Sequence, residues 1–182
     1  MLTGSKVALR ARVESDIPIL HSGFHEDVET HAVADGRAWR PMAPSAEANP
    51  FKVQEPSPEV ALFTIVALDD DRVLGDTVLW SIDLHNRNAH IGIGVLPEAR
   101  GHGFGRDATQ VLCRYAFRTL GLQRLQIETN IDNVAMLAVA GRAGFTLEGT
   151  LRRAAWANGL FVDEAVLGLL ASEWSAAHTD LA

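Results

Sequence analysis

The chain has 182 residues and a formal net charge of −7 at pH 7, with 47% hydrophobic and 21% charged residues. This composition is typical of a globular protein with enough residues for one sizeable core, and it predicts a single domain over residues 1–182. The acidic balance argues against a nucleic-acid partner, and no apolar run approaches the roughly 18 residues that a membrane span needs.

The cysteine count and the first residues of the chain bear on cellular location. The one cysteine, Cys113, cannot form an internal disulfide, and the first residues lack the basic-then-apolar pattern of a secretion signal. We therefore expect a cytoplasmic protein with no membrane partner. The sequence does not fix the oligomeric state, and a homodimer stays open.

In the first third of the chain, periodicity appears and is then lost. Apolar and charged residues alternate over 6–12, which predicts a half-buried strand. A helix follows, with Ser15 as its N-cap and Pro18 tolerated in its first turn. From residue 25 to 59 the pattern disappears, and this stretch holds five of the seven prolines. We expect a short helix and loop there, with residues 25–60 forming a variable segment that shapes the substrate site.

The rest of the chain alternates strands and helices. Strands are predicted at 62–68, 73–84 and 90–95, an antiparallel meander. An amphipathic helix follows and ends at Gly121. A strand at 125–129, a helix from about residue 134 to Gly141 or Gly144, and strands at 145–156 and 161–170 complete the order. The order predicts one α/β domain of the α+β type, a mixed sheet with helices on its faces.

The stretch IGIGVLPEARGHGFGRDA (residues 91–108) leads from an apolar strand through three alternating glycines into the amphipathic helix. A helix N-terminus has unpaired N–H groups and partial positive charge, and glycines let backbone N–H groups converge on an anion. A single glycine favours a tight turn, but three in this setting favour a phosphate cradle. The P-loop and dinucleotide patterns G-x-x-x-x-G-K-[ST] and G-x-G-x-x-G are absent.

The loop does fit R-x-x-G-x-G, from Arg100 to Gly105. It resembles the diphosphate loop of the GCN5-related N-acetyltransferase (GNAT) superfamily, which binds coenzyme A. Residues 115–154 (YAFRTLGLQRLQIETNIDNVAMLAVAGRAGFTLEGTLRRA) and 158–174 are similar to the ribosomal-protein N-acetyltransferase (RimJ/RimL-type) branch. The resemblance covers about residues 62–174 and is absent over residues 25–59. It implies a GNAT-like fold with splayed central strands, acetyl-CoA as co-substrate, and no metal.

The resemblance also implies roles for particular residues. The loop would hold the diphosphate through Arg100, Gly101, His102, Gly103, Phe104, Gly105 and Arg106. The thioester arm would lie in a gap between residues 91–95 and 125–129, with the backbone N–H of Val95 polarising the thioester carbonyl. Asn133 and Met136 would line this arm, and a plain N-cap is the equal alternative for Asn133.

The implied reaction is direct attack of a primary amine on acetyl-CoA in a ternary complex. The acceptor would be the α-amine of a protein N-terminus or a small-molecule amine. His90, where relatives often have a glutamate, and Glu128 on the opposing strand are candidate bases, with ordinary strand positions as the alternative for both. Because neither is a strong base, an α-amine, which is less basic than a lysine amine, is favoured.

One position departs from the branch. Serine is common where this chain has Met136, and methionine cannot protonate the leaving thiolate. Three explanations are open for this difference. The thiolate leaves without a proton donor, another hydroxyl or a water molecule replaces the serine, or the catalytic activity is weak. A coenzyme A-binding module with little catalysis therefore remains an alternative, as does an acyltransferase that uses another donor such as succinyl-CoA.

Other side chains carry simpler expectations. The histidines at 21, 25 and 31, with Glu26 and Glu29, have a loose metal-like spacing but no supporting ligand pattern, and we expect a solvated helix face rather than a zinc site. Cys113 is expected to be structural, on the apolar side of its helix. Core positions are expected for Trp39, Trp80 and Trp156, with walls of an acceptor pocket as the alternative.

Overall fold

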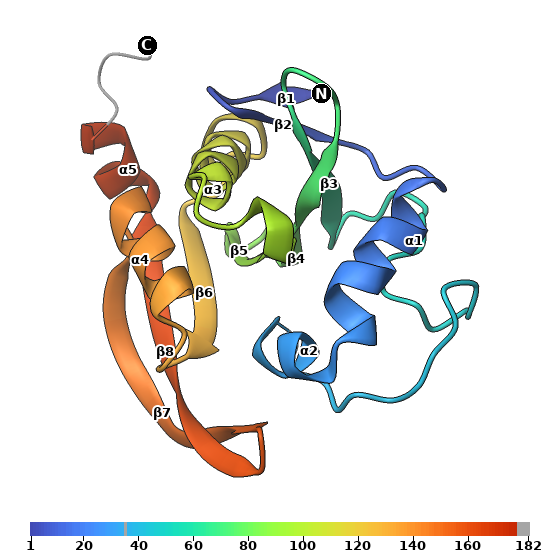
Figure 1. The fold of residues 1–182 in the computed structure, drawn as a ribbon. Helices are drawn as coiled ribbons and strands as arrows, with labels where there is room; N and C mark the ends of the chain where they lie inside the picture. Colours follow the sequence, from blue (N-terminus) through green and yellow to red (C-terminus); the bar gives the residue numbers. More distant parts are fainter. Residues whose placement is uncertain (35, 178–182) are drawn as a thin grey trace.

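The computed structural model describes residues 1–34 and 36–177, and an eight-stranded sheet forms its centre (Figure 1). The strands are β1 (Leu2–Thr3), β2 (Val7–Arg10), β3 (Ala61–Ala67), β4 (Val73–Asp83), β5 (Asn88–Val95), β6 (Arg124–Asn130), β7 (Thr146–Ala157) and β8 (Leu160–Leu170). The helices are α1 (Asp16–His21), α2 (Val28–Ala34), α3 (Phe104–Arg114), α4 (Val134–Ala143) and α5 (Ala171–Ala177). Residue 35, within the predicted 25–60 segment, and residues 178–182 lie outside this description.

The sheet has the order β1-β2-β3-β4-β5-β6-β8-β7 and is split in its middle. All neighbouring strands are antiparallel except β5 and β6, which run parallel. β5 and β6 pair only over Asn88–His90 and Arg124–Gln126, although β6 remains paired with β8 to its last residue. The predicted splay is therefore present. It begins later on β6 than expected, because Leu125 and Gln126 still pair with β5.

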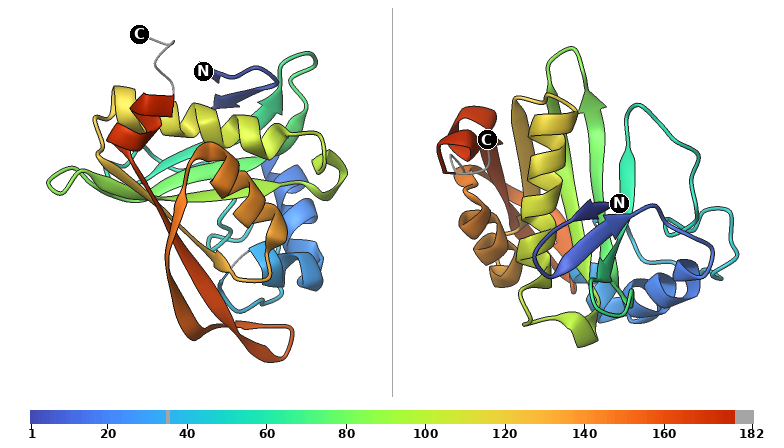
Figure 2. Two further views of the ribbon diagram at one scale, coloured as in Figure 1. Left: turned by 90° about the vertical axis from the view of Figure 1, so that its left-hand side faces the viewer. Right: turned by 90° about the horizontal axis from the view of Figure 1, so that it is seen from above.

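The helices cover both faces of the sheet (Figure 2). α3 packs against β2, β4 and β5, and α4 packs against α3 and β6. Alternate residues of β5 face opposite sides. Val95 approaches Gly105 of α3, whereas a β-carbon on Gly94 would lie 2.9 Å from Cζ of Phe24, just after α1. We call these two sides the α3 face and the α1 face.

One apolar core extends between the sheet and its helices. Its largest fully buried members are leucines and isoleucines from nearly every layer, among them Leu9, Leu20, Ile65, Leu74, Leu79, Leu112, Leu125, Ile127 and Leu169. Cys113 of α3 is fully buried in this core, and burial raises the pKa of its thiol to about 12. The expectation of a structural cysteine is consistent with this position.

The predicted elements are present, with differences at their ends. The short β1 and the final α5 carry too few periodic residues to be predicted. π-Helical turns, Ser22–Glu26 and Tyr115–Thr119, extend α1 and α3. Of the two glycines proposed to end α4, Gly144 does so, because it adopts a left-handed conformation with φ of 98° while Gly141 lies inside the helix.

The tryptophans are not where the sequence placed them. Trp39, Trp80 and Trp156 are 37%, 41% and 64% exposed, so the expectation that they fill the core is wrong. Trp174 of α5 is buried instead, and its ring lies 5.6 Å from that of Phe117. Within the described ranges, no helix has both the length and the apolar character required to cross a membrane.

Candidate functional site

The glycine loop turns left-handed twice before α3 begins. Gly101 and Gly103 both have φ of 81°, a conformation that strains any residue with a β-carbon. Gly103 is the N-cap of α3, and its side-chain-free position leaves the first N–H groups of the helix without a capping side chain. The surface at Gly101, His102 and Gly103 is exposed, so an anion can reach this helix end.

The other loop residues hold the turn in place. Arg100 folds back so that its Nε donates to the carbonyl oxygen of Val95 (3.1 Å), and His102 Nδ1 lies 2.8 Å from the carbonyl oxygen of Arg100. The Phe104 ring is half-buried and stacks on the His102 ring with centroids 5.7 Å apart. Arg106 is exposed on the first turn of α3. The loop is therefore built against the end of β5.

Gly105 has a packing role. A β-carbon there would lie 3.3 Å from Cγ2 of Val95 and 3.9 Å from Cγ2 of Val139. The missing side chain therefore lets the first turn of α3 approach both β5 and α4. The glycine loop and the end of β5 lie together at the mouth of the gap.

Backbone groups of β5 face this gap. Leu96 N donates to Leu74 O (2.9 Å), so residues 96 and 74 form a hydrogen-bonded pair. Such pairs alternate along an antiparallel ladder, and the Val95 and Ile93 backbone groups therefore point away from β4. They point toward β6, which no longer pairs with β5 there. The gap thus leaves this strand edge, beside a helix N-terminus, without a neighbouring strand, although the Val95 carbonyl oxygen accepts from Arg100 Nε.

The two candidate bases meet where the strands begin to diverge. His90 pairs with Gln126 at the last β5–β6 position, and its Nδ1 lies 3.8 Å from Oε1 of Glu128. That separation is too long for a hydrogen bond but close enough for charge attraction. His90 Nδ1 is buried and has no hydrogen-bond partner, and the Trp80 ring lies 4.3 Å from the imidazole. Gln126 Nε2 donates to Oε1 of Glu128 (2.7 Å) and orients it.

These side chains lie on the α1 face. His90 and Gly94 are separated by four residues of β5 and project from the same side of the strand. The half-buried His90 is thus reached from the side opposite the glycine loop. The glycine loop and the His90–Glu128 pair therefore border the gap on opposite faces of the sheet.

Asn133 is the N-cap of α4, as one of its two interpretations expected. Its Oδ1 accepts from Met136 N (3.1 Å), and its Nδ2 donates to the Thr129 hydroxyl (3.1 Å). Thr129 is buried on the part of β6 that borders the gap. The Met136 side chain is half-buried against the core. Sequence analysis missed Thr129, which has no distinctive motif.

Residues 21–42 form a histidine ladder, and the expectation of a solvated helix face is wrong. His21, His25 and His31 are buried, 2–7% exposed. Their Nε2 atoms lie 2.9–3.1 Å from the carbonyl oxygens of Met42, Arg40 and Arg37, respectively. Because a carbonyl oxygen only accepts, each Nε2 carries the hydrogen. The ladder ties the segment after α2 to the helices of the α1 face.

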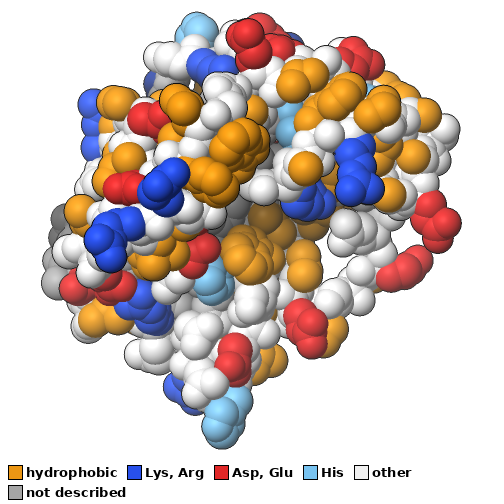
Figure 3. Space-filling model, turned by 90° about the horizontal axis from the view of Figure 1, so that it is seen from below, with side chains coloured by type: hydrophobic (Ala, Val, Ile, Leu, Met, Phe, Trp, Pro, Cys, Tyr) orange, Lys and Arg blue, Asp and Glu red, His pale blue; other side chains and the backbone are white. Residues whose placement is uncertain are grey.

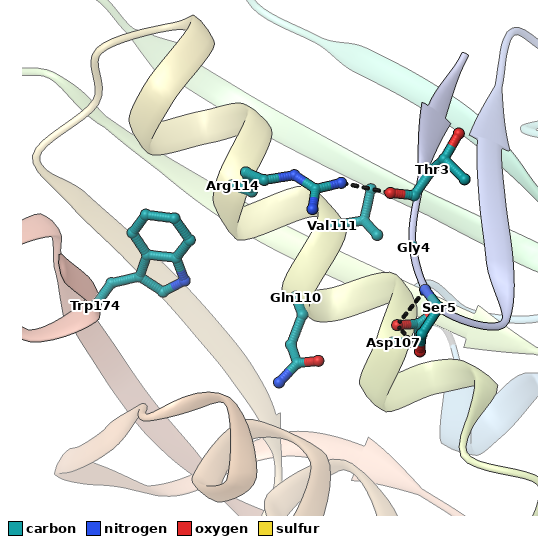
Figure 4. Close-up of a pocket in the computed structure, with 8 residues that line it drawn as sticks. All are labelled: Thr3, Gly4, Ser5, Asp107, Gln110, Val111, Arg114 and Trp174. Atoms are coloured by element: carbon teal, nitrogen blue, oxygen red, sulfur yellow. Dashed lines mark hydrogen bonds between the residues drawn. The ribbon is translucent and has the colours of Figure 1, made fainter. Parts of the chain in front are cut away.

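The face shown in Figure 3 has a central recess whose walls carry hydrophobic side chains, with charged side chains around it. Two further pockets lie elsewhere, one of about 320 Å³ between the β1–β2 turn and α3 (Figure 4) and one of about 340 Å³ beside the start of β3. Among the described side chains, no group of three or more His, Cys, Asp or Glu is arranged to hold a metal ion.

Comparison with known proteins agrees with this architecture. Residues 6–146 match the model of the acetyltransferase (GNAT) domain family. The chain belongs to the GNAT acetyltransferase family. The GNAT match begins at Lys6 and includes β5, the glycine loop, α3 and α4, so it contains the whole gap.

Relatives of this GNAT chain include N-acetyltransferases of several names. It is 30% identical over 113 residues to the uncharacterized N-acetyltransferase p20 of Bacillus licheniformis, covering 62% of this chain and 64% of that one. It is 31% identical over 94 residues to the ribosomal-protein-serine acetyltransferase of Escherichia coli (strain K12), covering 52% of each. The chain thus spans less than two thirds of either relative. The ribosomal-protein branch expected from the motifs is represented among them.

A solved structure has the same fold. The spermidine N-acetyltransferase from Vibrio cholerae, solved in complex with CoA and spermine, superposes with a TM-score of 0.83 at 20% identity. The match covers 93% of this GNAT chain and 98% of that structure. The predicted GNAT-like mixed sheet is therefore confirmed.

Proposed function

We propose that this protein transfers an acetyl group from acetyl-CoA to a primary amine by direct attack in a ternary complex. One observation carries the proposal: the unpaired edge of β5 at residues 91–95 lies beside a left-handed glycine turn at the N-terminus of α3. The strand edge fits the amide groups of a pantetheine arm, and the helix end fits a diphosphate. The Vibrio cholerae neighbour with this fold was solved with CoA.

The loop residues would bind the diphosphate and the strand edge would bind the arm. Backbone N–H groups from Gly101 to Arg106 supply donors, with Arg100, His102 and Phe104 maintaining the shape of the turn. Acetyl-CoA supplies a reactive thioester. The backbone N–H of Val95, which points into the gap, would donate to the acyl oxygen as negative charge develops on it. Asn133 and Met136 lie at the start of α4, on the β6 side of the gap.

His90 would accept the proton of the attacking amine. Glu128 lies on the Nδ1 side of the imidazole, where its carboxylate stabilises the imidazolium that forms, and Gln126 fixes that carboxylate. Proton transfer therefore involves the other ring nitrogen, Nε2. This geometry supports a combined role for the two residues that the sequence offered as alternative bases.

Thr129 is the hydroxyl that the structure offers in place of the branch serine. Because its oxygen accepts from Asn133 Nδ2, its own hydrogen is free to be donated elsewhere. We propose that Thr129 assists the departing thiolate where Met136 cannot. A coenzyme A-binding module without efficient catalysis is the second candidate, and the methionine at position 136 is the observation that favours it.

Residues 25–60 would shape the acceptor site on the α1 face. They carry His25 and His31 of the histidine ladder and all three of its carbonyl partners, and Phe24 beside them packs over Gly94 of β5. An α-amine of a peptide N-terminus is the acceptor we favour, because a histidine base suits an amine that is partly neutral near pH 7. A polyamine, the substrate named for the Vibrio cholerae neighbour, is the small-molecule alternative.

The test is a donor-by-acceptor matrix with the purified protein. Acetyl-CoA and succinyl-CoA are each combined with a peptide bearing a free α-amine, the same peptide with a blocked N-terminus and one lysine, and spermidine. Mass spectrometry identifies the acylated product, and released CoA thiol gives the rate. We expect saturable acetyl-CoA binding and acetylation of the free α-amine peptide.

Each other result has a defined meaning. Acetyl-CoA binding without amine-dependent thiol release supports the binding module. Faster turnover with succinyl-CoA would replace acetyl-CoA as the proposed donor. Exclusive acetylation of spermidine would replace the peptide α-amine as the proposed acceptor. Absence of any CoA binding contradicts the proposed function altogether.

A further inference from the structure

The turn between β1 and β2 is clamped to α3 by a buried carboxylate. Asp107, on the first turn of α3, accepts from the backbone N–H groups of Ser5 (3.1 Å), Lys6 (2.7 Å) and Val7 (3.0 Å), and from the Ser5 hydroxyl (2.9 Å). Arg114, two turns later, donates to the Thr3 carbonyl (Figure 4). Burial raises the pKa of Asp107, but these hydrogen bonds outweigh it, so its pKa lies below the usual range.

The space around the clamp allows little movement. A β-carbon on Gly4 would collide with the Asp107 carboxylate, so this close approach requires glycine. Residues about a hundred positions apart in sequence are thereby fixed relative to each other. The clamp places the side chain of Lys6 beside the glycine loop.

Lys6 contacts the loop at one peptide group. Its Nζ donates to the carbonyl oxygen of His102 (2.9 Å) and would lie 3.4 Å from a β-carbon on Gly103. In a trans peptide the carbonyl and the following N–H point in opposite directions. Holding the His102 carbonyl on the Lys6 side therefore turns the Gly103 N–H to the other side, at the exposed N-terminus of α3.

We propose that Lys6 is a positioning residue for the CoA diphosphate: it fixes the His102–Gly103 peptide so that the Gly103 N–H faces the anion. This inference rests on the proposed function and extends it to a residue outside the glycine loop. The ammonium also adds positive charge beside the helix N-terminus, where a diphosphate needs it. The clamp depends on the backbone of Lys6, so truncating its side chain leaves the clamp intact.

The test compares Lys6→Ala and Lys6→Arg with Lys52→Ala, a change at the only other lysine in the chain. Affinity for CoA is measured by calorimetry, and the steady-state constants for acetyl-CoA and the amine are measured separately. We expect Lys6→Ala to weaken CoA binding about tenfold, the typical effect of losing one charge-assisted hydrogen bond. The arginine variant should recover most of the loss, while kcat and the amine KM stay unchanged.

CoA lacking its 3′-phosphate separates the two anionic groups of the ligand. If Lys6 acts through the loop on the diphosphate, the same tenfold loss appears with the dephosphorylated form. A loss that disappears with this form overturns the inference, because it places Lys6 at the 3′-phosphate. An equal effect of Lys52→Ala, or no effect of Lys6→Ala, also overturns it.

The wild-type measurement distinguishes the two levels of the proposal. Wild-type protein that binds CoA and acetylates amines, with an inert Lys6→Ala change, contradicts only the role of Lys6. Wild-type protein that does not bind CoA contradicts the proposed function and this inference together.

Discussion

The two faces of β5 are built by different kinds of contact. On the α3 face, positive-φ glycines shape the glycine loop, and the buried Asp107 carboxylate holds the β1–β2 turn beside it. On the α1 face, buried imidazoles bind the backbone carbonyls of a segment with no regular structure. In the proposed function, the first arrangement would present donors to a ligand of fixed chemistry. The second uses its donors within the protein, so ring faces and apolar groups would form the proposed acceptor site.

This difference explains why the α3 face can be recognised from a short sequence motif and the α1 face cannot. A diphosphate demands N–H donors at a helix end, and a few consecutive residues supply them. An acceptor site formed by residues 25–60 depends on which carbonyl each histidine reaches.

The largest expected effect is at the glycine turn. Gly103→Val places a β-branched residue at φ of 81° where the diphosphate would bind, and we expect CoA affinity to fall by at least about a hundredfold, from backbone strain together with steric exclusion. Calorimetry measures the CoA affinity of the variant and of the wild-type protein. Gly159→Val is the matched control, because Gly159 has φ of 82° in the β7–β8 turn. Retention of micromolar CoA binding by Gly103→Val contradicts the loop assignment.

Next in size is the effect expected at His90, the proposed base on the α1 face. We expect His90→Ala to lower kcat by about 10²–10⁴, the usual contribution of a general base, and to flatten the acidic limb of the pH–rate profile. The KM for acetyl-CoA should not change, because the loop lies on the other face. Glu128→Gln should give a smaller loss in the same direction. An unchanged pH profile for His90→Ala removes it from the mechanism.

The clamp on the α3 face predicts a stability effect with a defined pH dependence. Asp107→Asn should lower the free energy of unfolding at pH 7 by about 3 kcal/mol, because buried N–H groups lose a charged acceptor. The folded pKa of Asp107 is lowered. The ionised Asp107 carboxylate therefore makes its full contribution to the free energy of unfolding above the pKa that it has in the unfolded chain. This contribution is lost as the pH falls through its pKa in the folded protein.

Urea titrations from pH 7 to pH 3 measure this effect. The wild-type and Asp107→Asn stabilities should converge toward the acid end. Asp83→Asn is the control, because Asp83, the last residue of β4, also accepts backbone N–H groups and has a lowered pKa, but its hydrogen bonds are exposed, so water can replace them. A difference between wild type and Asp107→Asn that stays constant with pH would contradict the role of the ionised carboxylate.

The smallest expected effect tests the histidine ladder. His25→Phe keeps a planar ring beside Trp39 but leaves the Arg40 carbonyl without its donor. We expect the KM for the amine to rise about fivefold, equivalent to about 1 kcal/mol, while CoA affinity stays within twofold. His85→Phe, in the exposed β4–β5 turn, is the matched change. An effect on CoA affinity instead of the amine would show that the faces are not separate.

The fold was largely predictable because its signals are local. Alternation over 6–12 and the helical period after Gly103 each report burial of the residues that carry them, and β2 and α3 formed there. The meeting of His90 with Glu128 was not predicted as a pair. It depends on where the parallel β5–β6 register ends, which the sequence of neither strand shows by itself.

The wrong predictions also concern contacts between different segments of the chain. The three histidines of the ladder have a spacing that suits a solvated face or a buried one, and the carbonyls that decide between them come from a segment without periodicity. Lys6 and Asp107 were also missed in the site, because the clamp connects the second strand to a helix about a hundred residues later. A short motif cannot show such a contact.

The buried sulfur of α3 has a practical consequence for following the reaction. Cys113 is fully shielded and its thiol stays protonated far above neutral pH, so a reagent that colours free sulfhydryls finds no target on the folded enzyme. Colour developing with time then counts liberated coenzyme alone. A sudden extra equivalent per molecule would report that the protein has opened.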